Sequence, residues 1–278
     1  MKTVWRIVLI LAGILVLLGV ATMAVSLFSG GGLGDLRNRV MLTNYNQSFE
    51  AEEVQTLHVE ALVGEVTLMR GEELRVEAKN VTENGFGCVL ENGCLTVREQ
   101  EHVSWADKLS RLLLLRRNTP KICIYLPAEL NLAQAEMHLG AGRAQIEGLD
   151  AQKLKIEVEV GTLTATQLSA QEAEIDLRAG KAELSSLQAQ TLRLHADAGN
   201  VRLQAEVESY CSVDVAAGTA DLTLAGSAAD YTTRIAAFAG AIHCDGQRFV
   251  NEQVTLGQGA KTLYLQNDVG NVRVDFAG

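Results

Sequence analysis

The sequence predicts an all-β protein, a right-handed parallel β-helix (β-solenoid) with coils of about 19 residues, preceded by one transmembrane helix. Two observations predict the solenoid. Gly142, Gly161, Gly180, Gly199 and Gly218 lie 19 residues apart, and Gly240 follows after 22. Around each glycine apolar and polar residues alternate, and this period of two is typical of strands. A fixed repeat of about 20 residues indicates stacked structural units.

The same apolar pattern surrounds every one of these glycines. Apolar or small residues stand seven, five, three and one positions before the glycine, and two and four positions after it. Around Gly161 they are Leu154, Ile156, Val158, Val160, Leu163 and Ala165. Coils stacked about 4.8 Å apart would bury this apolar row and pair their backbones. Glycine at each corner of a coil would supply positive φ at little steric cost. Because parallel crossovers are usually right-handed, we expect a right-handed β-helix.

The first residues predict a membrane anchor. A short basic lead ending at Arg6 precedes Ile7–Phe28, a run of 22 residues without a charge. About 20 apolar residues span a bilayer, whereas a secretory signal has an apolar region of about 7 to 15. We therefore expect residues 1–29 to be a signal anchor, with a cleaved signal peptide as the alternative. Lys2 and Arg6 favour a cytoplasmic N-terminus. We therefore expect a single-pass cell-membrane protein whose C-terminal domain is extracytoplasmic.

The rest of the chain divides into a linker and one domain. Residues 30–50 begin with a glycine run and are expected to be a flexible linker. Residues 51–278 are expected to form the β-helix, irregular over 51–130 and regular over 131–278. Gly64 carries an early copy of the repeat, and Gly270 restores its phase near the end. Asn92-Gly93 predicts a two-residue hairpin turn, and a strand over 122–126 ends at Pro127.

One segment, residues 103–117, departs from the strand pattern and is helical and basic in character. It could lie on an anionic membrane surface or contact a partner. Alternatively, it is a loop helix that covers an end or side of the solenoid. The residues of interest are Trp105, Lys108, Arg111, Arg116 and Arg117.

Composition limits the function classes. The net charge of −10 argues against nucleic-acid binding, because phosphate contacts need clustered basic residues. The coils between Gly142 and Gly218 contain scarcely any insertions that could wall a catalytic cleft, and no catalytic or phosphate-loop motif occurs. We therefore expect a protein without catalytic activity and without a cofactor.

An outward row of histidines and acids stands four residues before successive glycines, and we call it the histidine row. Its members are His138, Glu157, Asp176, His195 and Asp214. Such groups are suitable ligands for a divalent cation. One ligand per coil is too sparse for a closed coordination shell, so a solvated polar row is the expected reading. Two residues earlier, a second row alternates in charge: Glu136, Lys155, Glu174 and Arg193.

The five cysteines have different predicted environments. Cys211 and Cys244 occupy apolar positions of the repeat and are expected in the core. Cys88 and Cys94 flank the Asn92-Gly93 turn, but two-residue pairing would put Glu91 opposite Cys94. A bridge between these two cysteines is therefore not expected. Cys123 has no clear partner.

The strand over residues 121–127, which ends in Leu126-Pro127, is followed by Gly140-Ala141-Gly142 and alternating apolar residues. In these features residues 50–278 resemble the putative-adhesin family of bacterial surface β-helix proteins, whose LiaG-type members often carry an N-terminal anchor. The family has no established catalytic residues and its function is not defined. The resemblance implies a surface binding or adhesin-like module with a protein, cell-wall or glycan partner. An accessory of a cell-envelope stress system is the alternative, and a carbohydrate-active enzyme a minor one.

Overall fold

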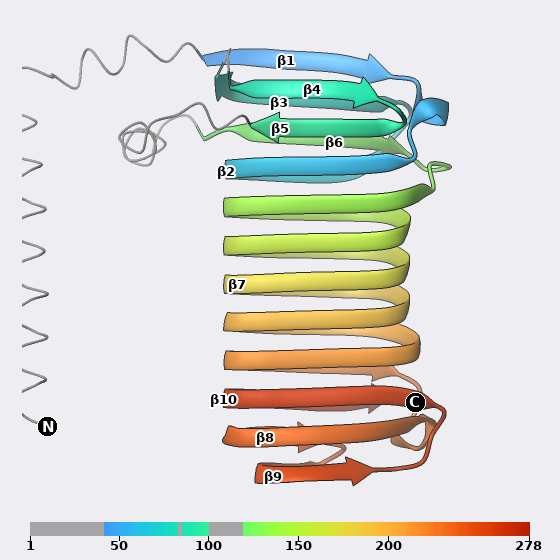
Figure 1. Ribbon diagram of the computed structural model, residues 1–278, viewed down its shortest axis with the longest axis vertical. Coiled ribbons are helices and arrows are strands. Elements are labelled where there is room, and N and C mark those ends of the chain that lie inside the picture. Colours follow the sequence, from blue (N-terminus) through green and yellow to red (C-terminus); the bar gives the residue numbers. More distant parts are fainter. Residues whose placement is uncertain (1–41, 83–84, 100–118) are drawn as a thin grey trace, which may run out of the picture.

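The computed structural model describes residues 42–82, 85–99 and 119–278, and these form a solenoid of stacked strands (Figure 1). Besides two short 3-10 turns, Ala51–Glu53 and Ala228–Asp230, the regular structure of this part of the chain is β-strand. No helix in these ranges is long and apolar enough to cross a membrane. The strands are β1 (Leu42–Phe49), β2 (Thr56–Gly71), β3 (Leu74–Thr82), β4 (Phe86–Glu91), β5 (Cys94–Glu99), β6 (Lys121–Pro127), β7 (Leu132–Ala225), β8 (Tyr231–Cys244), β9 (Gln247–Leu256) and β10 (Lys261–Ala277).

The predicted coil repeat is confirmed. β7 is one continuous run of 94 residues that winds through the middle of the solenoid (Figure 1). The neighbouring strands keep its register, because Gly64 of β2 pairs with Gly142 and Gly270 of β10 pairs with Gly218. Aliphatic side chains from every coil point inward and form a single core, with Ile156, Ile175 and Leu194 at most 2% exposed.

The glycines form a column in which each residue lies against the glycine of the next coil. Gly142, Gly161 and Gly180 have φ values of 138°, 153° and 131°, which L-residues rarely adopt. A Cβ at Gly180 would also overlap the carbonyl oxygen of Gly161, and one at Gly161 would overlap that of Gly142. Both the backbone angle and the spacing of the coils therefore require glycine.

One part of the predicted core pattern is wrong. The apolar residue directly before each glycine does not point inward: Val160 is 57% exposed and Val269 is 56% exposed. Val158 and Leu163 are both fully buried, although they are five positions apart and strict alternation would place them on opposite faces. The chain bends at the glycine, so strict alternation breaks there. The residue before the glycine lies on the outside of that bend.

The end of the chain does not form the end of the solenoid. β10 pairs in parallel with β7 on one side and with β8 on the other, so the strand order is β7-β10-β8-β9. Gly240 lies beyond Gly270, although it comes earlier in the sequence. β9 then pairs antiparallel with β8 and closes this end (Figure 1).

The opposite end uses the same arrangement. β2 lies between β7 on one side and β5 and β6 on the other, although both β5 and β6 follow it in sequence. β3 pairs antiparallel with β6, and β4 with β5. β1, which lies in the stretch where a linker was expected, pairs antiparallel with β3 and forms the outermost strand. Antiparallel strands thus cover both ends of the parallel array.

Candidate functional site

The histidine row forms a polar strip on the outside of the strands that lead into the glycine column. Its five residues lie at intermediate exposure, while the residues on either side of each one point into the core. This alternation is what the sequence predicts for the row. A neighbouring row lies two residues closer to the glycines and contributes Glu159, Arg178 and Asp197. We call the two rows together the polar face.

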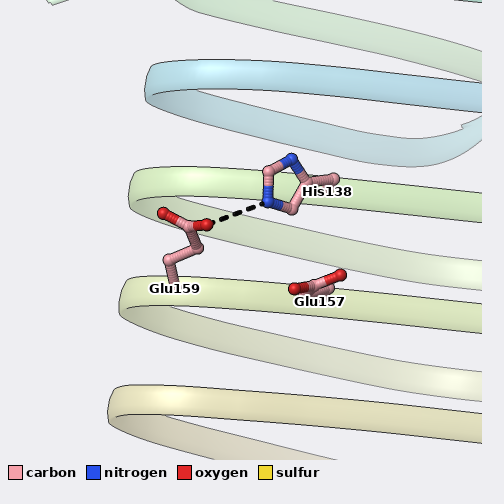
Figure 2. Close-up of side chains that lie close together, drawn as sticks. All are labelled: His138, Glu157 and Glu159. Atoms are coloured by element: carbon pink, nitrogen blue, oxygen red, sulfur yellow. Dashed lines mark ion pairs between the residues drawn. The ribbon is translucent and has the colours of Figure 1, made fainter.

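At one point the polar face brings three metal-ligand side chains together. Nε2 of His138 lies 3.5 Å from Oε1 of Glu159 on the next coil. One ligand-type atom from each of His138, Glu157 and Glu159 lies within 4.8 Å of the other two (Figure 2). His138 and Glu157 belong to the predicted histidine row, whereas Glu159 lies in the neighbouring row and is not part of that pattern.

Arg178 already supplies a positive charge to these carboxylates. Its Nη2 atom lies 3.0 Å from Oε1 of Glu157, and its Nη1 atom lies 3.8 Å from Oε1 of Glu159. The Arg178 side chain is 57% exposed, so this contact is in large part solvated. Exposed ion pairs of this kind contribute about 0 to 1 kcal/mol.

A second cluster surrounds His195. Its Nε2 atom lies 2.8 Å from Oδ1 of Asp197, and its Nδ1 atom lies 3.3 Å from Oδ2 of Asp214. Burial lowers the pKa of His195, but the hydrogen bond to Asp197 and the charges of Asp214, Asp197 and Asp176 outweigh it. The net result is a pKa above the ordinary value of 6.5. The acids around the imidazole therefore favour its protonated form.

Acids also crowd one another between these two clusters. Burial raises the pKa of Asp176, and the negative charges of Glu174 and Glu157 raise it further, against the opposing effects of His195 and Lys155. Like charges on neighbouring strands destabilise a sheet. The polar face therefore holds an excess of negative charge that its own basic residues only partly compensate.

In the second predicted row, which alternates in charge, Glu136 and Arg193 contact residues outside the row. Glu136 lies 3.4 Å from Nδ1 of His58, a residue of β2. The guanidinium of Arg193 lies over the ring of Tyr210, 5.8 Å from its centre. Both contacts lie on the same side of the coils as the histidine row and extend its charged surface.

All five cysteines are free thiols. Cys211 and Cys244 are buried, as their repeat positions predict. Burial raises the pKa of the Cys211 thiol to about 12. In the hairpin Glu91 pairs with Cys94 and Cys88 pairs with Val97, which confirms the predicted register. Cys88 instead lies against Tyr45, and burial raises its pKa to about 11.

The recesses in the described coils are shallow or small. The larger, of about 400 Å³, lies half a coil away from the glycine column and is lined by Ser169, Ala170, Gln171, Gln188, Ala189, Gln190 and Glu208. An apolar void of about 10 Å³ lies in the core near Leu57 and Ile156. Neither recess includes a residue of the polar face.

The basic segment 103–117, with Trp105, Lys108, Arg111, Arg116 and Arg117, lies outside the described residues, as does the proposed anchor 1–29. The strands that flank them are described. β1 begins at Leu42, β5 ends at Glu99 and β6 begins at Lys121. All three strands belong to the same end of the solenoid (Figure 1).

The stacked coils and the glycine column show that the protein is a β-solenoid. Comparison with known families identifies its family. Residues 54–275 match the model of the family described as Toastrack DUF4097. The chain therefore belongs to the Toastrack DUF4097 family. No curated protein matches the sequence.

Comparison with solved structures finds several similar chains at low sequence identity. A "putative adhesin" from Bacteroides fragilis is 14% identical, with 84% of this chain and 97% of that chain covered and a TM-score of 0.42. A "putative cell adhesion protein" from Clostridium sporogenes is 12% identical, with coverage of 85% and 100% and a TM-score of 0.34. A "putative lipid binding protein" from Parabacteroides distasonis is 10% identical, with coverage of 84% and 97% and a TM-score of 0.36. At these TM-scores the likenesses carry no conclusion about ligand or role.

Proposed function

We propose that this protein is a membrane-anchored, extracytoplasmic solenoid that acts as a non-catalytic surface binding module of adhesin-like character. The observation that carries the proposal is the polar face, a strip of acids and histidines repeated on consecutive coils of one continuous strand. A repeated surface of this kind suits a partner that makes the same contact several times. Solenoids commonly bind through such extended surfaces.

The anchor belongs to the proposal as well. The uncharged run Ile7–Phe28 is long enough to span a bilayer. The first described strand, β1, is the outermost strand at one end of the solenoid. An anchor joined there would leave the polar face, which extends along β7, accessible to partners outside the membrane.

Proximity labelling from the full chain on living cells tests this function. One variant removes three acids from the polar face: Glu159→Gln, Asp197→Asn and Asp214→Asn. A matched control removes three acids from the strands that follow the glycines: Glu147→Gln, Asp221→Asn and Asp275→Asn. We expect a set of labelled surface or wall partners that the first variant loses and the control keeps. Equal labelling by all three proteins would contradict a role for the polar face.

A regulatory role in an envelope-stress system is the second candidate. One observation favours it: residues 1–41 and 100–118 both connect to strands at the same end of the solenoid. If the anchor is embedded, the basic segment starts and ends near the membrane, where it could meet a membrane-bound sensor. Deletion of 105–117 separates the candidates. Loss of one labelled membrane protein in that deletion favours regulation, and unchanged labelling favours the adhesin-like module.

A further inference from the structure

The group formed by His138, Glu157 and Glu159 is more than a pair of neighbouring charges. The three side chains come from two adjacent coils, and their ligand-type atoms lie within 4.8 Å of one another (Figure 2). Bonds of about 2.0–2.2 Å in a tetrahedral Zn²⁺ site would hold two ligand atoms of one ion roughly 3.5 Å apart. Small rotations of partly exposed glutamates cover the remaining difference, with no movement of the backbone.

The kinds of ligand select the ion. Ca²⁺ and Mg²⁺ take oxygen ligands, and Ca²⁺ takes six to eight of them. An imidazole with two carboxylates instead suits a divalent transition metal such as Zn²⁺. Three protein ligands would leave at least one position of a tetrahedral site for water or for a group from a partner.

The surrounding charges favour a cation at this place. Glu60 of β2 is the register partner of His138 on the preceding coil, which adds a carboxylate on that side. Figure 2 shows the second ring nitrogen of His138 on the side of the ring that faces β2. A carboxylate on that side adds negative charge near the three ligand-type side chains, which favours a bound cation.

Arg178 is the group that a metal ion would displace. It lies 3.0 Å from Glu157 and 3.8 Å from Glu159, so both carboxylates already hold one cation between them. Its long side chain is 57% exposed and can turn into solvent when a metal ion takes its place. The guanidinium therefore competes with a metal ion for the same oxygens.

We propose that His138, Glu157 and Glu159 form a binding site for a divalent transition metal ion of the Zn²⁺ type, with Arg178 as its competitor. This site goes beyond the proposed surface-binding function and does not depend on it. The metal ion would bind at one position of the polar face, between the coils that contain Gly142 and Gly161.

Titration of the detergent-purified full chain with Co²⁺ and then Zn²⁺ tests the site. Co²⁺ is the spectroscopic probe, because thiolate ligands add an intense near-ultraviolet charge-transfer band that nitrogen and oxygen ligands lack. The variants are His138→Gln, Glu159→Gln and Arg178→Gln. The matched control is His58→Gln, a histidine of the same side that also faces a glutamate. Circular dichroism checks that each variant keeps its strands.

We expect one equivalent of Co²⁺ without a thiolate band, and displacement of that Co²⁺ by Zn²⁺. Loss of a ligand in His138→Gln or Glu159→Gln should weaken binding by at least about tenfold, since even outer-shell partners cost 10–100-fold. Arg178→Gln should bind more tightly, and His58→Gln should match the unmodified chain. A thiolate band at the first equivalent would overturn the proposal. So would folded His138→Gln or Glu159→Gln proteins of unchanged affinity, or weaker binding by Arg178→Gln.

Discussion

At the scale of single residues, glycine in the column meets two separate demands. Gly180 has a φ of 131°, and a Cβ there would overlap the carbonyl oxygen of Gly161. Gly246 also has positive φ, 75°, but a Cβ there would meet nothing within 4 Å. The two positions therefore separate the cost of the backbone angle from the cost of the close approach between coils.

Substitution of these glycines by alanine should give unequal losses of stability. Gly180→Ala adds both strain and overlap with a neighbouring backbone, and we expect it to lower the free energy of unfolding by at least about 3 kcal/mol. Gly246→Ala adds the angle alone and should cost about 1–2 kcal/mol. Denaturant unfolding of the two variants and the unmodified chain measures the difference. Equal losses would mean that the coils do not approach as closely as described.

His195 predicts a pH dependence of stability. Its pKa in the folded protein lies above the unfolded value of 6.5, because the contacts with Asp197 and Asp214 outweigh burial. Its contribution to stability is therefore fully present below the unfolded pKa and is lost as pH rises through the folded pKa. We expect the unfolding midpoints of the unmodified chain and of His195→Gln to differ most at about pH 5.5 and to converge toward pH 8.5. A difference that grows with pH would contradict this assignment.

At the scale of elements, local patterns predicted most of the strands. The glycine interval and the inward rows predicted the coils of β7, and Asn92-Gly93 predicted the β4–β5 turn, where both residues have positive φ. The pattern failed at Val160, because a strict period of two does not register a bend. It also missed Glu159, because contacts between adjacent rows depend on side-chain direction across two coils.

The order of the last coils could not be read from the repeat. Gly240 and Gly270 each fit the position next to Gly218, since both have apolar or small residues at most positions of the repeat, with Thr233 and Asn267 as the respective exceptions. The structure places Gly270 there and Gly240 beyond it. β8 and β9 form a hairpin through Asp245-Gly246, a two-residue turn signal that is not part of the repeat. β9 therefore covers one edge of β8, and the other edge pairs with β10.

The register of the β4–β5 hairpin predicts the thiol content of the chain. Because Cys88 pairs with Val97 and Cys94 with Glu91, the two cysteines do not face each other across the strands. All five cysteines are free. We therefore expect five reactive thiols per chain when protein prepared without reductant is denatured and titrated with a thiol reagent. A value of three would reveal a disulfide and contradict the assignment of five free thiols.

At the scale of the whole molecule, β2 and β10, the two strands that flank β7, are built in out of sequence order. β2 lies between β7 and the β5 and β6 strands, and β10 lies between β7 and β8. Strands near the chain ends usually fray, because they pair on one side. β2 and β10 pair on both sides, and antiparallel strands lie beyond their outer parallel partners. The proposed binding face spreads over several coils and needs this continuity, because its groups hold their spacing only while the coils stay in register.

Amide hydrogen exchange on the full chain tests this account most directly, because β9 provides an internal reference within the same molecule. β10 pairs with β7 and β8, whereas β9 is an outer strand that pairs with β8. We expect the amides of β10 to be protected as strongly as those in the middle of β7, and much more strongly than those of β9. Exchange of β10 as fast as that of β9 would show that the C-terminal strand is not built into the solenoid.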